Sequence, residues 1–436
     1  MKSKRVGVAV AGRPHPEHLE QRMCGIVAYI GHRPCRSLLL EGIKRLEYRG
    51  YDSAGIAVIT PNGDGGGQLL LERRAGRISV LEAALEAQPE LDGSLGIAHT
   101  RWATHGEPSD GNAHPHRDAP AGTENTHGIA LVHNGIIENY AAIRTYLEEQ
   151  GRTFSSDTDS EVLCQLISQL YDGDLQAAVQ VALCEVTGAY AIAVICAEEP
   201  DTLVVARKGS PLIVGVGNNE FIVGSDAAAI VAHTAQAFTL DDYGVCKLTR
   251  EDFHTTTIDN IPLTPKVQQI EMDLEAIELG GYPHHMLKEI FEQPQKITTC
   301  LRGRIHLQEN TVVLGGVSDF SRDLVRAKRI VLLGQGTALH AAMVGEYLLE
   351  DLAKLPSEVE YASEFRYRSP IVDEGTIAIA VSQSGETADT LAAVDEAKQR
   401  GALTLGVVNV VGSSIARETD LGVYLRVGPE IGVAST

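Results

Sequence analysis

Two different patterns of apolar residues follow each other along the chain. From residue 24 to about residue 264, short apolar runs alternate with Gly, Asp and Asn turns, and segments with apolar residues at helical spacing lie between them. The expected strands are 25–30, 54–60, 128–132, 189–196, 202–206 and 221–225, and the expected helices are 37–46, 140–150, 159–171 and 174–185. Strands with interspersed helices predict a layered α+β domain.

After residue 284 the apolar runs become nearly continuous and alternate regularly with helical segments. The expected strands are 329–333, 376–381 and 403–409, and the expected helices are 338–354, 388–400 and 413–418. This alternation indicates an α/β domain with a doubly wound parallel sheet. Ligands bind such sheets at the carboxyl ends of the strands, which draws attention to the polar loop 382–387. The Gly- and Pro-punctuated stretch 260–283 predicts a linker between the two domains.

Length and charge limit the classes of partner. A chain of 436 residues has room for two to three domains. Its 37 Lys and Arg against 58 Asp and Glu give a net charge of -21, which repels nucleic acid and anionic membranes. No apolar run approaches the ~20 residues of a membrane span. We therefore expect a soluble protein with neither nucleic acid nor a membrane as partner.

Cysteine usage points to a reducing compartment. The seven cysteines are odd in number and form no CxxC pair. A disulfide framework or a structural zinc site is therefore not expected. We predict a cytoplasmic protein without a metal ion or a cofactor.

Cys24 is the most informative single position, because it follows Met23 directly. Translation from Met23, followed by removal of that methionine, would place the thiol at the N-terminus beside its own α-amine. That amine titrates at ~8 and could accept the thiol proton, so one residue would carry both nucleophile and base. The alternative is a small buried hydrophobe. Residues 1–22 resemble a short secretory signal, but the apolar stretch is short and contains glycine. We expect Met1 to be a misassigned start, with a cleaved propeptide as the alternative.

Three segments of the first domain concentrate polar side chains: residues 99–106, 133–135 and 156–159. Taken singly, each has a structural alternative: a surface ion pair for Arg101, a hairpin turn for Asn134 and Gly135, and a helix N-cap for Thr158 or Asp159. A further pair, His114 and His116, has metal-like spacing, but no third ligand is evident and a structural role is favoured.

Together with Cys24, these segments resemble the class II glutamine amidotransferases of the N-terminal-nucleophile hydrolase fold, a four-layer αββα arrangement. The resemblance rests on residues 24–27, 45–55, 99–106, 112–116 and 133–139. More narrowly, the second half is similar to the sugar isomerase (SIS) domain of the isomerising glutamine:fructose-6-phosphate aminotransferase family, on residues 288–294, 362–368, 382–387 and 430–436. The implied organisation is an extension at 1–22, an amidotransferase domain at 23–265, a linker at 266–285 and a first SIS domain at 286–436.

The resemblance implies roles in the amidotransferase domain. Cys24 would attack the side-chain amide of L-glutamine, with an oxyanion hole formed by Asn134 and Gly135. Arg101 would hold the substrate carboxylate and Asp159 its α-ammonium group. Thr104 and His105 would line the glutamine pocket, and Trp102, also expected at this site, would close the route by which ammonia leaves.

In the SIS domain the resemblance implies a site for the phosphate of fructose 6-phosphate. The matching residues are Thr337, Ser382, Gln383, Ser384, Thr387, Val433 and Ser435. One departure is Ala338, where the family usually carries a serine. The lost hydroxyl would cost ~1 kcal/mol of binding if nothing compensates.

The family transfers ammonia from glutamine to fructose 6-phosphate, giving glucosamine 6-phosphate and glutamate, and its full-length members are expected to be homodimers. The family also carries a second SIS domain, whereas this sequence stops at Thr436. We therefore expect a truncated enzyme with glutaminase activity and partial sugar-phosphate binding.

Two rival functions remain open. One is the purine-pathway amidotransferase that acts on phosphoribosyl pyrophosphate, although its pyrophosphate-binding loop with paired acidic residues is absent. The other is a non-catalytic sugar-phosphate sensor, which would follow if residues 1–22 are retained and the nitrogen of Cys24 is an amide.

Overall fold

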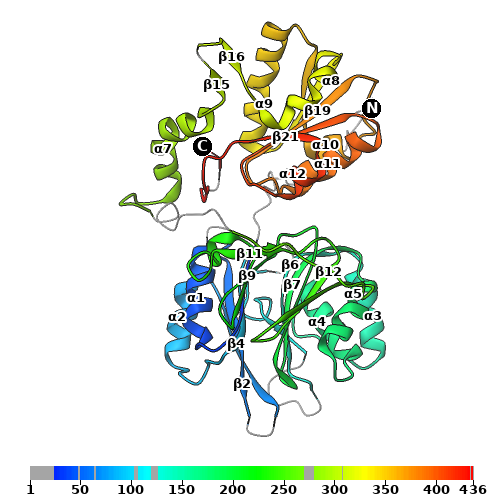
Figure 1. Ribbon diagram of the computed structural model, residues 1–436. Coiled ribbons are helices and arrows are strands. Elements are labelled where there is room, and N and C mark those ends of the chain that lie inside the picture. The colour runs from blue at the N-terminus through cyan, green and yellow to red at the C-terminus, as the bar shows by residue number, and fades with distance from the viewer. Residues whose placement is uncertain are drawn as a thin grey trace, which may run out of the picture.

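The computed structural model describes residues 24–47, 50–62, 65–102, 107–118, 126–269, 279–306, 308–432 and 434–435. The expected extension 1–22 lies outside these ranges. Within them, the chain forms an N-terminal domain built on two antiparallel sheets and a second domain built on one parallel sheet (Figure 1).

The first sheet of the N-terminal domain has the strand order β14-β11-β9-β10-β1-β4-β2-β3 among the described residues. Its strands are β1 (Gly25–Ile30), β2 (Ser53–Pro61), β3 (Gly67–Ala75), β4 (Leu95–Arg101), β9 (Ile213–Val216), β10 (Phe221–Gly224), β11 (Gln236–Thr239) and β14 (Gln268–Gln269). The first strand, β1, lies between β10 and β4. The residue that precedes it, Cys24, is therefore held at the end of a central strand.

The second sheet has the order β13-β12-β8-β7-β6-β5 in the described part of the chain. Its strands are β5 (His116–Arg117), β6 (Ile129–Ile137), β7 (Gly188–Cys196), β8 (Glu199–Lys208), β12 (Gly244–Leu248) and β13 (Phe253–Thr257). Apolar residues of both sheets, such as Ile26, Ile97 and Ala193, share one buried cluster between them. The two sheets therefore pack face to face.

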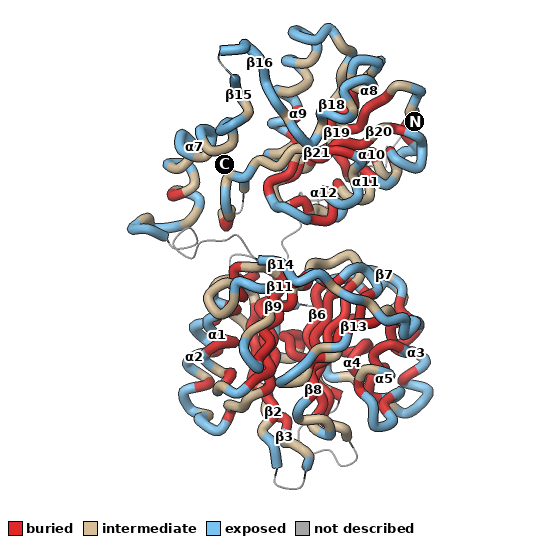
Figure 2. Tube along the Cα trace, viewed as in Figure 1, coloured by how far each residue is buried: buried red, intermediate tan, exposed pale blue. Residues whose placement is uncertain are grey.

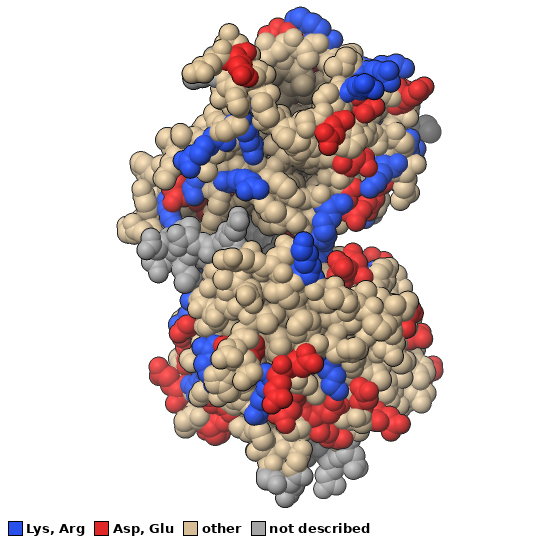
Figure 3. Space-filling model, viewed as in Figure 1, with Lys and Arg blue, Asp and Glu red and all other residues tan. Residues whose placement is uncertain are grey.

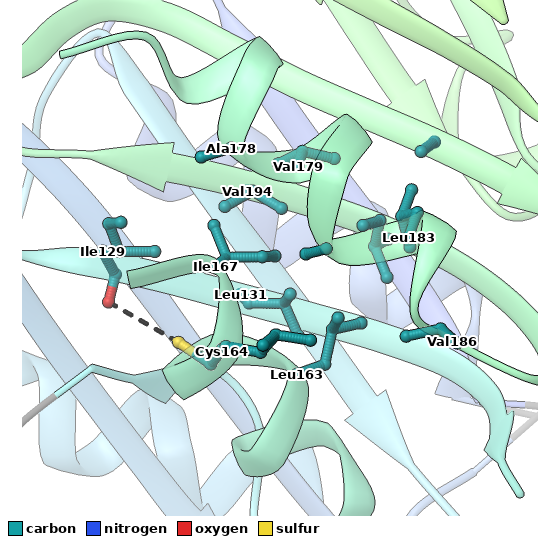
Figure 4. Close-up of a cluster of buried hydrophobic side chains, with 14 of the residues drawn as sticks. Ile129, Leu131, Leu163, Cys164, Ile167, Ala178, Val179, Leu183, Val186 and Val194 are labelled. Atoms are coloured by element: carbon teal, nitrogen blue, oxygen red, sulfur yellow. Dashed lines mark hydrogen bonds between the residues drawn. The ribbon is translucent and has the colours of Figure 1, made fainter. Parts of the chain in front are cut away.

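Helices cover the outer face of each sheet. They are α1 (Cys35–Arg45), α2 (Ile78–Glu86), α3 (Tyr140–Glu149), α4 (Asp159–Leu170) and α5 (Leu175–Cys184), with a 3₁₀ turn at Ala227–Ala229. A second cluster joins α1 and α2 to the first sheet, and a third joins α3, α4 and α5 to the second sheet. Figure 4 shows part of the third cluster, in which Ile167 of α4 lies beside Leu131 of β6 and Val179 of α5 lies beside Val194 of β7. Three clusters between four layers give the expected αββα arrangement.

The layering explains why β1 reads as a continuous apolar run rather than an alternating one. Alternate residues of a strand point to opposite faces. Ile26 and Ala28 enter the cluster between the sheets, whereas Val27 and Tyr29 enter the cluster under the helices. Both faces are covered, so β1 is buried along its whole length. In Figure 2 the buried residues of this domain, in red, gather at its centre between the outer helices.

The C-terminal domain has a parallel sheet with the order β18-β17-β19-β20-β21 among its described residues. Its elements are β17 (Arg329–Gly334), α9 (Gly336–Leu348), a π-helical turn at Leu349–Ala353, β18 (Ser357–Tyr361), α10 (Ala362–Phe365), β19 (Thr376–Ser382), α11 (Ala388–Gln399), β20 (Leu403–Val408), α12 (Ser414–Glu418) and β21 (Leu421–Tyr424). Separate apolar clusters lie on the two faces of this sheet. The doubly wound α/β arrangement is confirmed.

The segment between the two domains is more structured than a linker at 260–283 predicts. Strand β14 pairs with β11 of the first sheet. After the undescribed residues 270–278, helix α7 (His285–Leu301) begins. A short hairpin of β15 (Ile305–His306) and β16 (Thr311–Val312), a 3₁₀ turn at Gly315–Phe320 and α8 (Ser321–Val325) then lead into the parallel sheet.

On the face seen in Figure 3, acidic and basic side chains are mixed on the C-terminal domain, whereas the charges of the N-terminal domain gather at its far end and are mostly acidic there. Among the described residues, no helix combines the length and the apolar character that crossing a membrane requires.

Candidate functional site

Cys24 lies against the strand that carries the expected substrate-binding residues. In the pairing of β1 with β4, Gly25 is opposite Thr100. The backbone N–H of Trp102 donates to Cys24 Sγ at 3.2 Å. The thiol therefore sits at the point where β4 ends, beside Arg101 and Trp102.

A glycine makes this close approach possible. A Cβ at Gly50 would lie 2.6 Å from the carbonyl carbon of Arg101, well inside van der Waals contact. The same loop is held to β4 by a hydrogen bond from the Asp52 N–H to the Arg101 carbonyl oxygen, at 3.0 Å. Tyr51 of this loop packs edge-on against the ring of Trp102, with 5.2 Å between the ring centroids.

Asn134 and Gly135 lie inside β6, so the hairpin-turn alternative is wrong. They pair with Ala191 and Tyr190 of β7, and the strand continues to Ile137. Gly135 has φ of +135°, and a Cβ there would lie 2.1 Å from the Ala189 carbonyl oxygen. Only glycine fits this strand position. The side-chain amide of Asn134 donates to the Cys24 carbonyl oxygen at 2.8 Å, which brings β6 and Cys24 together.

Asp159 lies at the first turn of α4 but is not its N-cap. Thr158 takes that role, because its hydroxyl accepts from the Glu161 N–H at 3.2 Å. Asp159 is left to accept a hydrogen bond from the Ile137 N–H at 2.8 Å. This contact joins the start of α4 to the end of β6, next to Gly135. The carboxylate is only 5% exposed.

Arg101 is buried, and the surface-ion-pair alternative is therefore wrong. Its exposure is 3%. Burial lowers the pKa of the Arg101 guanidinium, while the negative charges of Cys24, Asp159 and Asp52 act to raise it. A guanidinium stays charged even in such surroundings. Arg101 thus lies within electrostatic reach of both Cys24 and Asp159.

Four buried histidines lie behind this site: His99, His114, His116 and His133. The His99 ring stacks on the His114 ring, and the His114 ring meets the His116 ring edge-on. His114 Nδ1 accepts from the His133 N–H at 3.2 Å, and His116 Nε2 lies 2.9 Å from the Thr158 hydroxyl. Burial lowers the pKa of both His114 and His116 well below the ordinary value. Within the described ranges, no group of three or more possible ligands is arranged to hold a metal ion.

The loop 382–387 connects β19 to α11 and is organised by its own hydroxyl groups. Ser382 Oγ accepts from the Gly385 N–H at 3.0 Å, and Ser384 Oγ accepts from the Glu386 N–H at 3.2 Å. The Thr387 hydroxyl lies 3.3 Å from that of Ser382, and Asn409 at the end of β20 donates its N–H to the Gln383 carbonyl oxygen at 3.1 Å. This gives a compact polar turn at a helix N-terminus, a place where backbone N–H groups favour anions.

Two other expected sugar-phosphate residues lie in the described part of the C-terminal domain. Thr337 follows a strand that neighbours the one before the loop 382–387, whereas the Ser435 hydroxyl is hydrogen-bonded to Glu430. Thr337 is in the first turn of α9, after β17, and β17 neighbours β19 in the parallel sheet. Both loops therefore leave the same edge of the sheet. Ser435 donates to Glu430 at 2.8 Å, while the nearby Ile431 N–H bonds to Glu289 of α7. Three expected site residues, Thr104, His105 and Val433, lie outside the described residues.

The structure also shows a contact that sequence reasoning missed, between the two domains. Arg207 of β8 is 1% exposed and donates to the Ser414 hydroxyl at 3.1 Å. Ser414, at the start of α12, in turn donates its hydroxyl to Glu386 at 2.7 Å. Glu386 belongs to the loop 382–387, so a buried arginine of the first domain is linked to that loop. The one feature of the sequence that could have indicated this contact is a charged residue, Arg207, directly after the apolar run of β8.

Comparisons with known proteins agree with this arrangement. A model described as a glutamine amidotransferase domain matches residues 87–273, and a model described as a SIS domain matches residues 323–436. The chain is 50% identical to the glutamine–fructose-6-phosphate aminotransferase [isomerizing] of Chlorobaculum tepidum over 420 residues, and 50% identical to that of Bacteroides thetaiotaomicron over 418 residues. Each match covers 95% of this chain and 66% of the relative, just under two thirds of its length.

Among solved structures, a glutamine phosphoribosylpyrophosphate amidotransferase from B. subtilis covers 92% of this chain and 90% of its own. It is 18% identical with a TM-score of 0.48, a likeness too low to support the rival function. Both the domain content and the sequence identity point to one group of proteins. The chain belongs to the family of isomerizing glutamine–fructose-6-phosphate aminotransferases, of which it holds the glutamine amidotransferase domain and one SIS domain.

Proposed function

We propose that the chain hydrolyses the side-chain amide of L-glutamine at Cys24 and that, in the complete protein, the ammonia passes to fructose 6-phosphate, giving glucosamine 6-phosphate and glutamate. One observation carries this proposal: two expected site residues converge on Cys24. The Trp102 N–H donates to the Cys24 sulfur, and Asn134 Nδ2 donates to the Cys24 carbonyl oxygen at 2.8 Å. The activity in the names of the relatives supports the choice of substrates.

The proposed reaction uses Cys24 as nucleophile and its own α-amine as base. The amine removes the thiol proton as sulfur attacks the amide carbon, and the negative charge moves to the amide oxygen. Asn134 Nδ2 and the Gly135 N–H stabilise that oxygen. The proton then passes to the amide nitrogen, which leaves as ammonia when the C–N bond breaks. Water attacks the thioester, its oxygen stays in the glutamate carboxyl group, and one of its protons returns through the amine to the Cys24 sulfur as the C–S bond breaks.

Two opposite charges select free glutamine. The Arg101 guanidinium matches the planar substrate carboxylate, and the Asp159 carboxylate matches the α-ammonium group. A glutamine within a peptide has neither a free carboxylate for Arg101 nor an α-ammonium group for Asp159, so it cannot form these two ion pairs. Trp102, Thr104 and His105 line the pocket in this proposal.

The sugar phosphate is assigned to the loop 382–387 and its surroundings. Hydroxyl groups of Ser382, Ser384 and Thr387, with loop N–H groups at the start of α11, suit a phosphate dianion. Gln383, Thr337, Val433 and Ser435 complete the proposed site. The net charge of -21 opposes anions globally, so local geometry has to hold the phosphate.

A cytoplasmic location and a homodimer belong to the same proposal. No disulfide joins the seven cysteines, all of which lie in the described part of the chain. This fits a reducing compartment. Light scattering on the purified chain tests the dimer.

The decisive experiment compares two N-termini. One form begins at Cys24, as verified by intact mass, and the matched control retains residues 1–23, so that its Cys24 nitrogen is an amide. We expect glutamate and ammonia from glutamine only in the first form. Equal turnover by both forms would rule out the α-amine as base, and a folded first form without hydrolysis would overturn the glutaminase assignment. Glucosamine 6-phosphate measured in the same assay tests whether this chain also performs the transfer, which we do not expect.

A further inference from the structure

The buried ring of His99 contacts the amide group of Asn134. His99 Nε2 lies 2.9 Å from Asn134 Oδ1. On its other side the same amide donates from Nδ2 to the Cys24 carbonyl oxygen, at 2.8 Å. A reversed amide would turn its oxygen toward that carbonyl and lose the hydrogen bond, because both atoms would be acceptors. The observed orientation therefore requires an N–H at His99 Nε2.

The surroundings of His99 supply that N–H. His99 lies in the middle of β4, opposite Ile26 of β1 and Gly55 of β2, and its ring is fully buried. The ring stacks on His114 with 4.3 Å between centroids, which fixes its plane. By distance and angle, His99 Nδ1 has no hydrogen-bond partner among the described residues, although the His133 backbone lies close enough to the ring to raise its pKa. Burial lowers the pKa of His99 to about 3. The ring is neutral at physiological pH, and its one proton is required at Nε2.

We propose that His99 is a positioning residue for glutamine hydrolysis, whose Nε2–H holds the Asn134 amide with its donor end turned toward Cys24. The inference rests on the proposed function of Cys24 and Asn134. Without this partner, only the hydrogen bond to the Cys24 carbonyl oxygen opposes rotation of the amide by half a turn, which would present the amide oxygen to the reaction. An oxygen placed there repels the negative charge that develops on the substrate amide, so the oxyanion hole loses one donor.

This role differs from that of a general base. The His99 contact is with Asn134, and the Cys24 sulfur is contacted by the Trp102 N–H. His99 therefore acts on the reaction through the orientation of another side chain. Its loss is expected to lower kcat more than it changes the KM for glutamine, because the oxyanion exists only in the transition state and intermediate.

The test uses three variants of the full chain with Cys24 at the N-terminus. His99→Leu removes the donor, His99→Gln keeps an N–H donor, and Asn134→Ala removes the group that is positioned. We expect His99→Leu to lower kcat by about 10- to 100-fold, less than the direct loss of an oxyanion donor, with KM changed by less than about threefold. His99→Gln is expected to recover most of this loss. In the Asn134→Ala background, His99→Leu is expected to have no further effect, since the two residues act as one unit.

Alkylation of Cys24 by iodoacetamide separates misfolding from misplacement. That reaction forms no oxyanion, so its rate is expected to be the same in wild type, His99→Leu and His99→Gln. A His99→Gln chain that alkylates normally but loses as much kcat as Asn134→Ala overturns the inference, as does additive loss in the double variant. If wild type hydrolyses glutamine and His99→Leu is equally active, only this inference fails. If wild type does not hydrolyse glutamine, the proposed function fails and the inference falls with it.

Discussion

The two candidate sites of this protein are built in different ways. Around Cys24, the polar side chains are part of the core: Asn134, Arg101 and Asp159 are 7%, 3% and 5% exposed. In the parallel-sheet domain, Thr337 is exposed, and Ser384 and Thr387 are only partly buried. The first candidate site is made of buried side chains held by two sheets and a helix, whereas the second is a loop in front of a helix N-terminus, of whose hydroxyl groups only that of Ser382 belongs to a buried residue. Single substitutions should therefore cost far more at the first site than at the second.

The strongest test of this comparison is Cys24→Ala. Loss of the nucleophile is expected to lower glutamine hydrolysis by about 10⁴-fold or more, because the remaining groups only bind and polarise the amide. Ammonia release is the measurement, and unchanged binding of glutamate by calorimetry is the control for folding. Hydrolysis within tenfold of wild type would show that another group is the nucleophile.

Arg101→Lys tests how strongly the first site depends on a single side chain, because it keeps the positive charge and removes the planar guanidinium group. We expect kcat/KM for glutamine to fall by about 100-fold, mostly through KM, because lysine cannot form the paired hydrogen bonds to a carboxylate. Steady-state kinetics measure this change. Arg207→Lys is the matched control, since Arg207 is buried in the same domain but contacts Ser414 instead. An equal fall in kcat/KM in both variants would mean that Arg101 affects hydrolysis only by stabilising the folded domain.

The buried histidines behind the first site predict a stability of the folded chain that depends on pH. Burial lowers the pKa of His99, His114 and His116 in the folded chain. Below about pH 6.5 these histidines are therefore protonated in the unfolded chain but stay neutral in the folded chain. The free energy of unfolding is then highest above pH 6.5 and falls as the pH drops from there toward the folded pKa values. The expected slope is about 1.4 kcal/mol per pH unit for each histidine.

Urea denaturation at about pH 7 and about pH 5 measures this loss, with the carboxylates still mostly ionised at both values. In His116→Gln, the change in the free energy of unfolding per pH unit should become smaller by the contribution of one histidine, about 1.4 kcal/mol. An identical slope in wild type and variant would contradict the assignment of the effect to this cluster.

The smallest expected effect is that of Thr387→Val in the loop 382–387. A hydrogen bond to a charged oxygen is worth about 1.5 to 3 kcal/mol, and the lower end applies to this partly buried hydroxyl, so the affinity for fructose 6-phosphate should fall by about 10-fold. Calorimetric titration with fructose 6-phosphate measures it, and Thr390→Val on α11 is the control. A loss above about 100-fold would break the comparison, because it would make one hydroxyl as critical as the groups around Cys24.

The link between Arg207, Ser414 and Glu386 joins the two regions. Charges on both domains influence this guanidinium: burial lowers the pKa of Arg207, while Asp242 of the first domain and Glu386 of the second raise it. A buried cation that bonds to a serine hydroxyl keeps Ser414 oriented toward Glu386. The loop 382–387 is therefore less independent of the amidotransferase domain than its exposure suggests.

Much of this organisation was open to prediction from the sequence. The continuous apolar run after Cys24, the helical spacing in 159–171 and the alternation of strands and helices after residue 329 identify both domains, because burial of one or two faces leaves a local pattern. The motifs around Arg101, Asn134 and Ser382 also stand out locally as polar side chains at strand ends and helix starts. These properties depend on residues close together in the chain.

Only the tertiary structure decided how those residues meet. Nothing local tells that Gly135 lies within a strand at positive φ, that Thr158 rather than Asp159 caps α4, or that Arg207 crosses to Ser414. The contacts responsible join residues far apart in sequence, such as Asn134 with Cys24 and His99 with Asn134. The physical reason is that hydrogen-bond partners in a buried site are chosen by the packing of whole sheets, and this packing leaves no periodic signal in any one segment.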